Sequence, residues 1–190
     1  MFLKIIYIFC FIFIKRFLTW IPQEYIFETQ LIPTLMTKFS IPELRTASLN
    51  CLTEIVSLTT GDLSDAYRQI LLQLLVVFIQ NLNNILPNQT NILEIYANGN
   101  ESQKLFINRL GHFISSFLTF HLKSLEDSGI KEVDDALVQA HIYLILISQV
   151  DDDEIFKTCL EYWYFFSKDL YTIASKASLS PGFVSPGIVS

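Results

Sequence analysis

The spacing of apolar residues constrains the fold most strongly, because they recur at steps of three and four through most of the chain. Such spacing places them on one face of an α-helix, which has about 3.6 residues per turn. No stretch shows a convincing alternation of apolar and polar residues, the pattern of a half-buried strand. The sequence therefore predicts an all-α fold. The four clearest series are Leu44, Ala47, Cys51, Ile55 and Leu58; Phe106, Leu110, Phe113, Phe117 and Phe120; Val133, Leu137, Ala140, Leu144 and Ile147; and Phe156, Cys159, Trp163, Phe166 and Leu170.

The predicted helices form about three antiparallel pairs. The pairs are residues 28–39 with 41–59, 65–86 with 101–122, and 133–150 with 152–171. Their second helices begin near residues 41, 101 and 152. When the loop at 87–100 is omitted, the first interval is about 46 residues, within the roughly 40–47 expected of a HEAT repeat. Each pair is apolar on more than one side, so we expect the pairs to stack into a HEAT-repeat α-solenoid segment.

The predicted helix at residues 65–86 is apolar almost all round, which is typical of a helix that neighbours cover on most sides. Its polar residues lie on one narrow stripe, which consists of Gln69, Gln73, Gln80 and Asn84. Pro87 ends this helix. The polar segment that follows, up to Asn100, is predicted to be a connection that contains one short turn.

Several helix boundaries carry recognisable signals. Residues 40–43 (Ser-Ile-Pro-Glu) are expected to form a capping box with proline in the first turn. Asn100 is expected to cap the next long helix together with Gln103. Gly61 and Gly129 are expected to end helices, and either Asp62 or Ser64 is expected to start one.

Residues 151–154 (Asp-Asp-Asp-Glu) raise the question of a metal site. They lack the spacing and the glycine of a calcium-binding loop. Asp151 and Glu154 stand three residues apart at the predicted start of a helix, where carboxylates accept hydrogen bonds from free backbone N–H groups. We therefore predict a helix cap and no metal.

No catalytic or cofactor site is predicted. The three cysteines, Cys10, Cys51 and Cys159, fit no disulfide framework and are expected to be buried thiols. His141 lies in an apolar run and is expected to be a hydrogen-bonded core residue. A pairing of His141 with Cys159 would need an oriented carboxylate or a nucleophile elbow, and the sequence offers neither. The aromatic residues are expected to provide packing, with Trp163 anchoring one helix pair to the next.

The charge and the N-terminus limit the partners further. The net charge of −6 argues against direct nucleic-acid binding, which needs clustered lysine and arginine. Residues 1–15 are predicted to form an apolar helix. It could be a buried helix, a signal peptide or a membrane anchor. The uncharged run from Ile5 to Ile14 is shorter than the roughly 20 residues that span a bilayer, and no cleavage motif follows it. We regard a membrane role as the weaker interpretation.

Four segments carry a resemblance to a known family. They are RFLTWIPQEYIFET at 16–29, LRTASLNCLTEI at 44–55, LPNQTNI at 86–92 and EIFKTCLEYWYFFSKDLY at 154–171. In this order they resemble the exportin-1 family of nuclear export receptors, within the importin-β superfamily. The resemblance covers residues 16–171 and corresponds to an internal part of the N-terminal half of the receptor. It implies a HEAT-repeat segment and no enzymatic activity.

The resemblance also implies partners for a longer parent protein. These are the Ran GTPase in its GTP-bound form, cargo proteins with leucine-rich export signals, and nucleoporins. It further implies shuttling between nucleus and cytoplasm. No binding residue is carried over, because neither Cys51 nor Cys159 occupies the family's reactive groove position. We also keep two alternatives, a small membrane-anchored helical protein and a generic HEAT-repeat adaptor.

Two end segments depart from the family pattern. Residues 1–15 are more apolar than the corresponding helix, and our hypothesis is a truncated or misassigned gene start at Met1. Residues 172–190 are rich in serine, proline and glycine, so they are expected to be a disordered tail.

Overall fold

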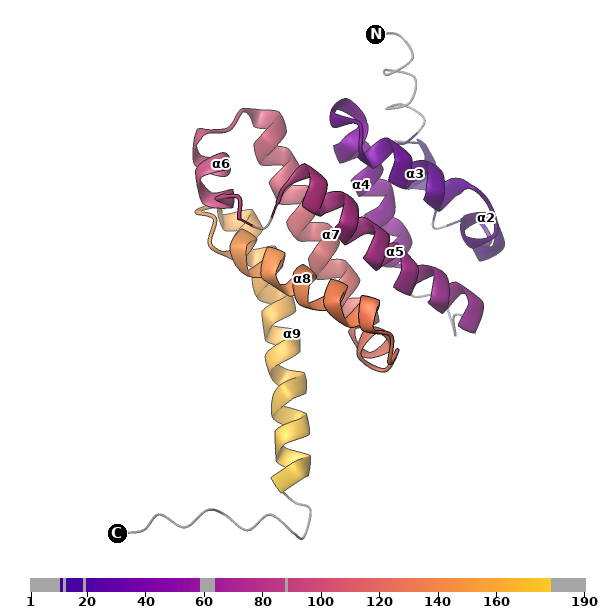
Figure 1. The fold of residues 1–190 in the computed structure, drawn as a ribbon, viewed down its shortest axis with the longest axis vertical. Helices are drawn as coiled ribbons and strands as arrows, with labels where there is room; N and C mark the ends of the chain where they lie inside the picture. Colours follow the sequence, from indigo (N-terminus) through magenta and orange to yellow (C-terminus); the bar gives the residue numbers. More distant parts are fainter. Residues whose placement is uncertain (1–10, 12, 19, 59–63, 88, 179–190) are drawn as a thin grey trace.

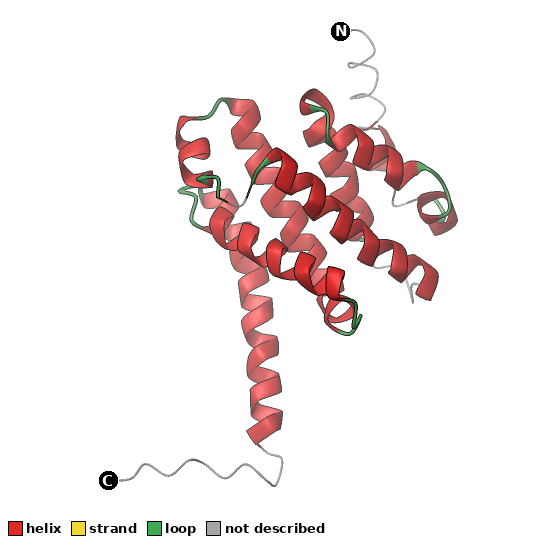
Figure 2. Ribbon diagram, viewed as in Figure 1, coloured by secondary structure: helices red, strands yellow, loops and turns green. Residues whose placement is uncertain are grey.

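The computed structural model describes residues 11–178 except for 12, 19, 59–63 and 88. Within these residues every regular element is a helix, as Figure 2 shows, so the all-α prediction is confirmed. The helices with complete bounds are α2 (Gln23–Phe27), α3 (Leu31–Phe39), α4 (Pro42–Val56), α5 (Asp65–Ile85), α6 (Ile92–Asn98), α7 (Glu101–Glu126), α8 (Lys131–Ser148) and α9 (Asp153–Ser178).

The long helices lie in two layers (Figure 1). Helices α3, α5 and α8 form one layer, and α4, α7 and α9 form the other. In the second layer α7 packs between α4 and α9, while α5 packs against α8 in the first layer. The pairs α3–α4, α5–α7 and α8–α9 therefore stack side by side, and the predicted solenoid of three helix pairs is confirmed.

Aromatic rings fill the interface between the first two pairs. Phe78 of α5 lies between Phe39 and Phe113, with ring centroids 5.0 and 4.2 Å away. Phe117 follows Phe113 at 5.7 Å and contacts the ring of His121 at 5.3 Å. These rings are almost completely buried. Contacts of this kind contribute about 0.5–1.5 kcal/mol per pair beyond burial, so the series of phenylalanines ties the pairs together.

The buried face of α7 differs from the predicted series at its end. Phe120 is 45% exposed, and His121 takes the buried place that was expected for it. A step of four from Phe117 continues the packed face, whereas a step of three at this point turns the side chain towards solvent.

The packed face of α9 is also rotated from the predicted one. Ile155, Cys159 and Tyr162 are buried, whereas Phe156 and Leu170 are about half exposed. Both series repeat at steps of three and four, so spacing alone could not choose between them. The indole N–H of Trp163 donates to Ser148 Oγ at 2.9 Å. Trp163 thus joins α9 to α8 within the last pair, and its predicted role as an anchor between pairs stays a prediction.

The helix caps agree with the sequence at most positions. Asn100 and Gln103 form the predicted capping box of α7, and the Ser64 side chain caps α5. Gly129 has a φ of 63°, which fits its predicted role as a break. The prediction of a capping box at residues 40–43 is wrong, because α4 begins at Pro42 and has Ile41 as its cap residue. Ser40 donates instead to Asn81 Oδ1 of α5.

The connection before α7 holds more structure than the predicted turn. Helix α6 spans seven residues, is capped by the Asn91 side chain and buries Ile92. It packs against α7 and α8. A buried isoleucine next to an asparagine cap is enough to hold a short helix on the body of the solenoid.

Helix α9 continues past the predicted boundary at residue 171. It ends at Ser178, so the expectation of a disordered tail is wrong for residues 172–178. Within this extension Thr172 Oγ1 donates to the carbonyl of Lys168, one turn earlier. Residues 179–190 lie outside the described part of the chain.

At the other end, Phe11 and residues 13–17 are helical. Phe11 and Leu18 are buried against the following helices. The rest of the apolar N-terminal stretch, residues 1–10, lies outside the described residues. Among those that are described, no helix is both long and apolar enough to cross a membrane.

Candidate functional site

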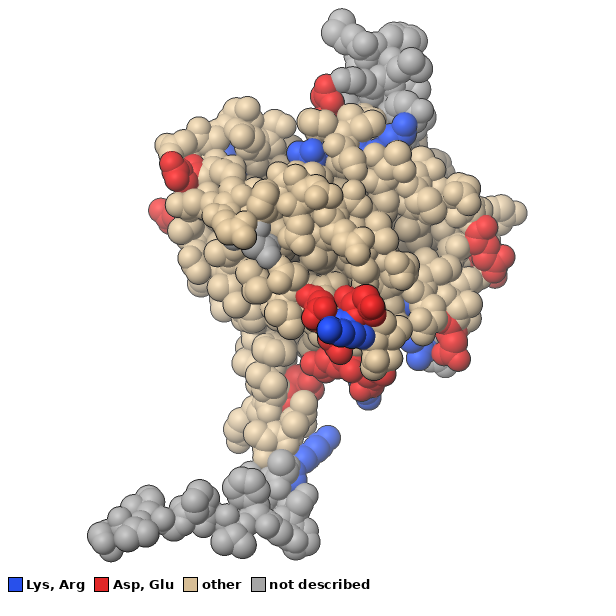
Figure 3. All heavy atoms as spheres, in the orientation of Figure 1, with Lys and Arg blue, Asp and Glu red and all other residues tan. Residues whose placement is uncertain are grey.

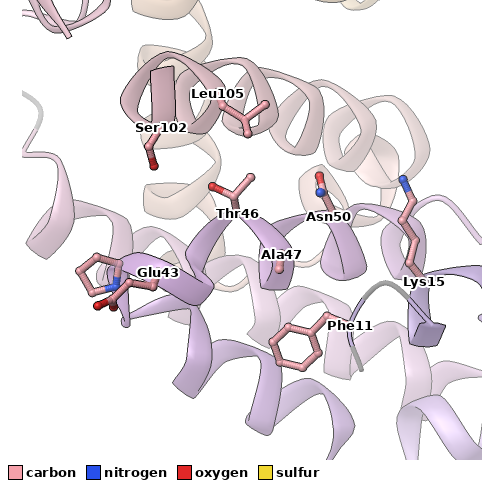
Figure 4. A pocket seen from close by; sticks show the side chains of 9 residues that line it. Phe11, Lys15, Glu43, Thr46, Ala47, Asn50, Ser102 and Leu105 are labelled. Atoms are coloured by element: carbon pink, nitrogen blue, oxygen red, sulfur yellow. The ribbon is translucent and has the colours of Figure 1, made fainter. Parts of the chain in front are cut away.

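The candidate site is a cleft of about 330 Å³ between α4 and α7, closed at one side by Phe11 and Lys15. We call it the α4–α7 cleft. Figure 4 shows Ser102 and Leu105 of α7 facing Thr46 and Asn50 of α4 across it. The lining residues are Phe11, Lys15, Pro42, Glu43, Thr46, Ala47, Asn50, Ser102 and Leu105.

Packing below the cleft fixes the two helices that line it. Leu44, Leu49 and Leu52 of α4 are buried, while the residues that line the cleft lie on the opposite, accessible side. At its far end α4 is held to α7 by His121, whose Nε2 lies 2.7 Å from the carbonyl oxygen of Val56. A carbonyl can only accept, so Nε2 carries the proton.

Three polar side chains in the cleft make no hydrogen bond to any described residue. They are Thr46, Asn50 and Ser102, which come from two helices and line the cleft together. Other hydroxyls behave differently: Thr53 and Ser57 of α4 donate to carbonyls one turn earlier. Side-chain groups that remain available in a concave surface are the usual means by which a pocket orients a ligand.

Charged groups stand at both ends of the cleft in Figure 4. At one end Lys15 Nζ lies 3.0 Å from Glu54 Oε1. At the other end is the exposed carboxylate of Glu43. The Lys15–Glu54 pair is partly exposed and contributes little to stability, so the two charges can exchange partners at low cost.

Three hydrogen-bond contacts of tyrosine and histidine side chains join neighbouring helices away from the cleft. The Tyr143 hydroxyl of α8 lies 2.5 Å from the Leu86 carbonyl oxygen and 2.7 Å from Asn83 Oδ1, both at the end of α5, and shares its single proton between these two acceptors. Burial raises the pKa of Tyr143 to about 12, so its hydroxyl remains a donor. His141 Nε2 lies 2.6 Å from the hydroxyl of Tyr162. The prediction of a hydrogen-bonded histidine is therefore confirmed.

The acidic run before α9 acts as a cap, although a different residue carries the role. Asp152 Oδ1 accepts from the backbone N–H groups of Glu154 and Ile155, each at 3.0 Å. Its Oδ2 accepts from the hydroxyl of Tyr96 at 2.7 Å. The Ile155 N–H, followed by the Tyr96 hydroxyl, lowers the pKa of Asp152. Asp151 and Glu154 were the predicted pair, and Asp152 replaces them because it stands one residue before α9.

The described cysteines are buried thiols. Cys51 Sγ donates to the carbonyl of Phe11, and burial raises its pKa to about 12. Burial also raises the pKa of Cys159. Neither forms a disulfide, as predicted, while Cys10 lies outside the described residues. In that part of the chain no group of three or more histidine, cysteine, aspartate and glutamate side chains is arranged to hold a metal ion.

Two family models match the chain. Residues 7–52 match the family described as "Exportin 1-like protein", and residues 135–171 match the one described as "Chromosome region maintenance or exportin repeat". Among curated proteins, the chain is 41% identical over 150 residues to Protein EXPORTIN 1A of Arabidopsis thaliana. This chain is an exportin-1 homologue. Exportin-1 of Schizosaccharomyces pombe is 38% identical and that of Drosophila melanogaster 40% identical, each over 157 residues.

The matched region is a small part of each exportin-1. The alignments cover 79–82% of this chain but 14% of each relative's length. Both the RFLTWIP and the EIFKTCLEYW segments quoted above contain residues that lie inside the family matches. The first match also contains seven of the nine residues that line the α4–α7 cleft, all except Ser102 and Leu105.

Sequence reasoning did not find the cleft. Thr46, Asn50 and Ser102 were not singled out because isolated polar residues on a helix are usually solvated. A weak signal was present, since Thr46 and Asn50 stand four residues apart on the side of α4 opposite its buried leucines. Only the packing of α4 against α7 shows that Ser102 faces them.

Proposed function

We propose that the chain is a segment of a nuclear export receptor, acting as a non-enzymatic helical-repeat scaffold. The observation that carries the proposal is the continuous stack of α4, α7 and α9, together with the similarity to exportin-1 proteins. In such a stack each helix pair contacts only its neighbours. A small change at each interface then adds up along the superhelix and can couple distant binding sites.

The finer proposal concerns the partners of the longer protein. It would bind Ran-GTP and cargo with leucine-rich export signals, contact nucleoporins and shuttle between nucleus and cytoplasm. The present segment would contribute part of the flexible superhelix and some of its accessible surface. The exposed apolar side chains of α9, including Phe156, Leu160 and Tyr164, support this role, because a further repeat would cover them.

A chimera tests the proposal. In Schizosaccharomyces pombe Exportin-1, the segment that matches this chain is replaced by the aligned residues of this chain. Nuclear export of a fluorescent reporter that carries a leucine-rich signal is then measured. We expect the chimera to exclude the reporter from the nucleus and to retain Ran-GTP-dependent binding of the export peptide. A stable chimera that binds neither would refute the proposal.

The membrane-anchored alternative predicts a different result. If the apolar N-terminal residues attach the chain to a bilayer, the native product would stay in the membrane pellet after carbonate extraction. We expect it in the supernatant. Retention in the pellet would favour the anchor over the transport role.

Binding of Ran-GTP and export peptide distinguishes a generic HEAT-repeat adaptor from a transport receptor. Such a protein would keep its fold in the chimera, yet the chimera would fail to bind Ran-GTP and export peptide together. The chimera experiment therefore separates this alternative from the transport role without a further assay.

A further inference from the structure

Arg109 stands on α7 next to the α4–α7 cleft, although it does not itself line the cleft. Residues 102, 105 and 109 stand three and four apart, so Ser102, Leu105 and Arg109 share one face of this helix. Ser102 and Leu105 line the cleft, as Figure 4 shows. Arg109 thus stands on the same face of α7, one turn beyond Leu105.

The charge of Arg109 has no counter-ion among the described residues. The side chain is half-buried, and its Nε is fully buried without a hydrogen-bond partner. Other arginines are satisfied: Arg45 donates to the carbonyls of Phe39 and Ser40. A partly buried cation that lacks a partner carries a desolvation cost, which a bound carboxylate would offset.

The neutral groups of the cleft fit a peptide main chain. Hydroxyl and primary amide groups each donate and accept, so Thr46, Asn50 and Ser102 can pair with both the N–H and the C=O of a peptide unit. Only an extended peptide offers these groups, because a helix uses its own. Leu105 and Ala47 form an apolar surface beside them, suited to one aliphatic side chain.

We propose that the α4–α7 cleft binds a short extended peptide that carries one aliphatic and one acidic side chain. Thr46, Asn50 and Ser102 pair with its main chain, and Leu105 packs against the aliphatic side chain. Arg109 pairs with its carboxylate. The carboxylates of Glu43 and Glu54 beside the cleft oppose a polyanion such as nucleic acid. This assignment goes beyond the transport role and does not depend on it.

The test uses the whole chain and defined probes. The probes are end-blocked, fluorescein-labelled hexapeptides of glycine and serine that carry one leucine and one aspartate at every pair of positions. Fluorescence anisotropy measures their affinity. We expect at least one to bind with a Kd below about 1 mM, and replacement of its aspartate by asparagine to weaken binding about tenfold.

Variants of the chain test whether Arg109 contacts the aspartate of the peptide. Arg109→Gln should weaken binding of the aspartate peptide about tenfold and should abolish the preference for aspartate over asparagine. Lys123→Gln is the matched control, because it removes an exposed cation from the same helix four turns away and should leave binding unchanged. Ser102→Ala should weaken both peptides equally, since it removes a main-chain contact at an exposed position that does not affect folding.

Three results would overturn the proposal. They are the absence of binding by every peptide in the set, equal binding of aspartate and asparagine peptides, and equal losses for Arg109→Gln and Lys123→Gln. Circular dichroism of each variant confirms that the helices are retained. If Arg109→Gln does not fold, the peptide comparison and Ser102→Ala still decide the outcome.

Discussion

Removing one hydroxyl group from the interior of the molecule tests how the second and third helix pairs of the stack are joined. Tyr143 has no exposed surface, and its hydroxyl shares one proton between the Leu86 carbonyl and Asn83 Oδ1. The Leu86 carbonyl stands at the C-terminal end of α5, where carbonyl groups lack partners within the helix. Tyr143→Phe deletes this donor and keeps the ring and its packing.

The magnitude follows from the hydrogen bonds that are lost. Asn83 is only half-buried and can turn to water, whereas Leu86 is buried and keeps an unpaired carbonyl. Leaving one buried acceptor unsatisfied costs about 1–3 kcal/mol, so we expect a loss of about 2 kcal/mol in the free energy of unfolding. In a domain of this size, that loss lowers Tm by about 4–8 °C.

Urea and thermal unfolding followed by circular dichroism measure the effect. Tyr164→Phe is the matched control, since that side chain is 69% exposed and its substitution should change the free energy by less than about 0.5 kcal/mol. If Tyr143→Phe were as stable as the unchanged chain, or if both variants lost the same amount, the Tyr143 contact would not hold α8 to α5.

Three other predictions concern pH, capping and packing. Burial lowers the pKa of His121, so the unfolded chain binds a proton more readily than the folded chain. The free energy of unfolding should therefore fall as the pH drops below about 6.5. Urea titrations at pH 7.5 and 5.5 should show a smaller difference for His121→Leu than for the unchanged chain. Asn100→Ala removes the capping box with Gln103 and should cost about 1 kcal/mol; an unchanged urea midpoint would contradict it. A Cβ on Gly111 would lie 3.1 Å from Ile147 Cγ2, so Gly111→Val should lower the free energy of unfolding by about 1–3 kcal/mol. A rise in Tm would contradict this and would mean that α8 can shift to make room for the larger side chain.

The fold was predictable because helical spacing and turn residues agree along the chain. The polar stripe of α5 is a clear case, since Gln69, Gln73, Gln80 and Asn84 are all exposed as expected. The capping box at Asn100 was equally predictable, because an asparagine that is followed three residues later by a glutamine can form both of its hydrogen bonds. Local chemistry decided these features, so no knowledge of neighbouring helices was required.

Features that depend on neighbours were less predictable. In α9 the Ile155 and Phe156 series have the same spacing, and only contact with α7 and α8 decides which of them is buried. The site was harder still. Ser102 is separated from Thr46 by two helices in the sequence, so no local pattern joins them, and Arg109 is notable only because its partner is missing.

Chemical labelling of α9 tests the open-ended stack most directly. Single cysteines are introduced by Leu160→Cys or Tyr164→Cys, with Gln80→Cys on the polar stripe of α5 as control and Cys10→Ser in all variants. Maleimide reaction rates are compared between the present chain and the Schizosaccharomyces pombe chimera. We predict that the cysteines at 160 and 164 react rapidly in the chain and slowly in the chimera, while that at 80 reacts equally in both. Rapid reaction at all three positions in a folded chimera would contradict the stacking of a further repeat on α9.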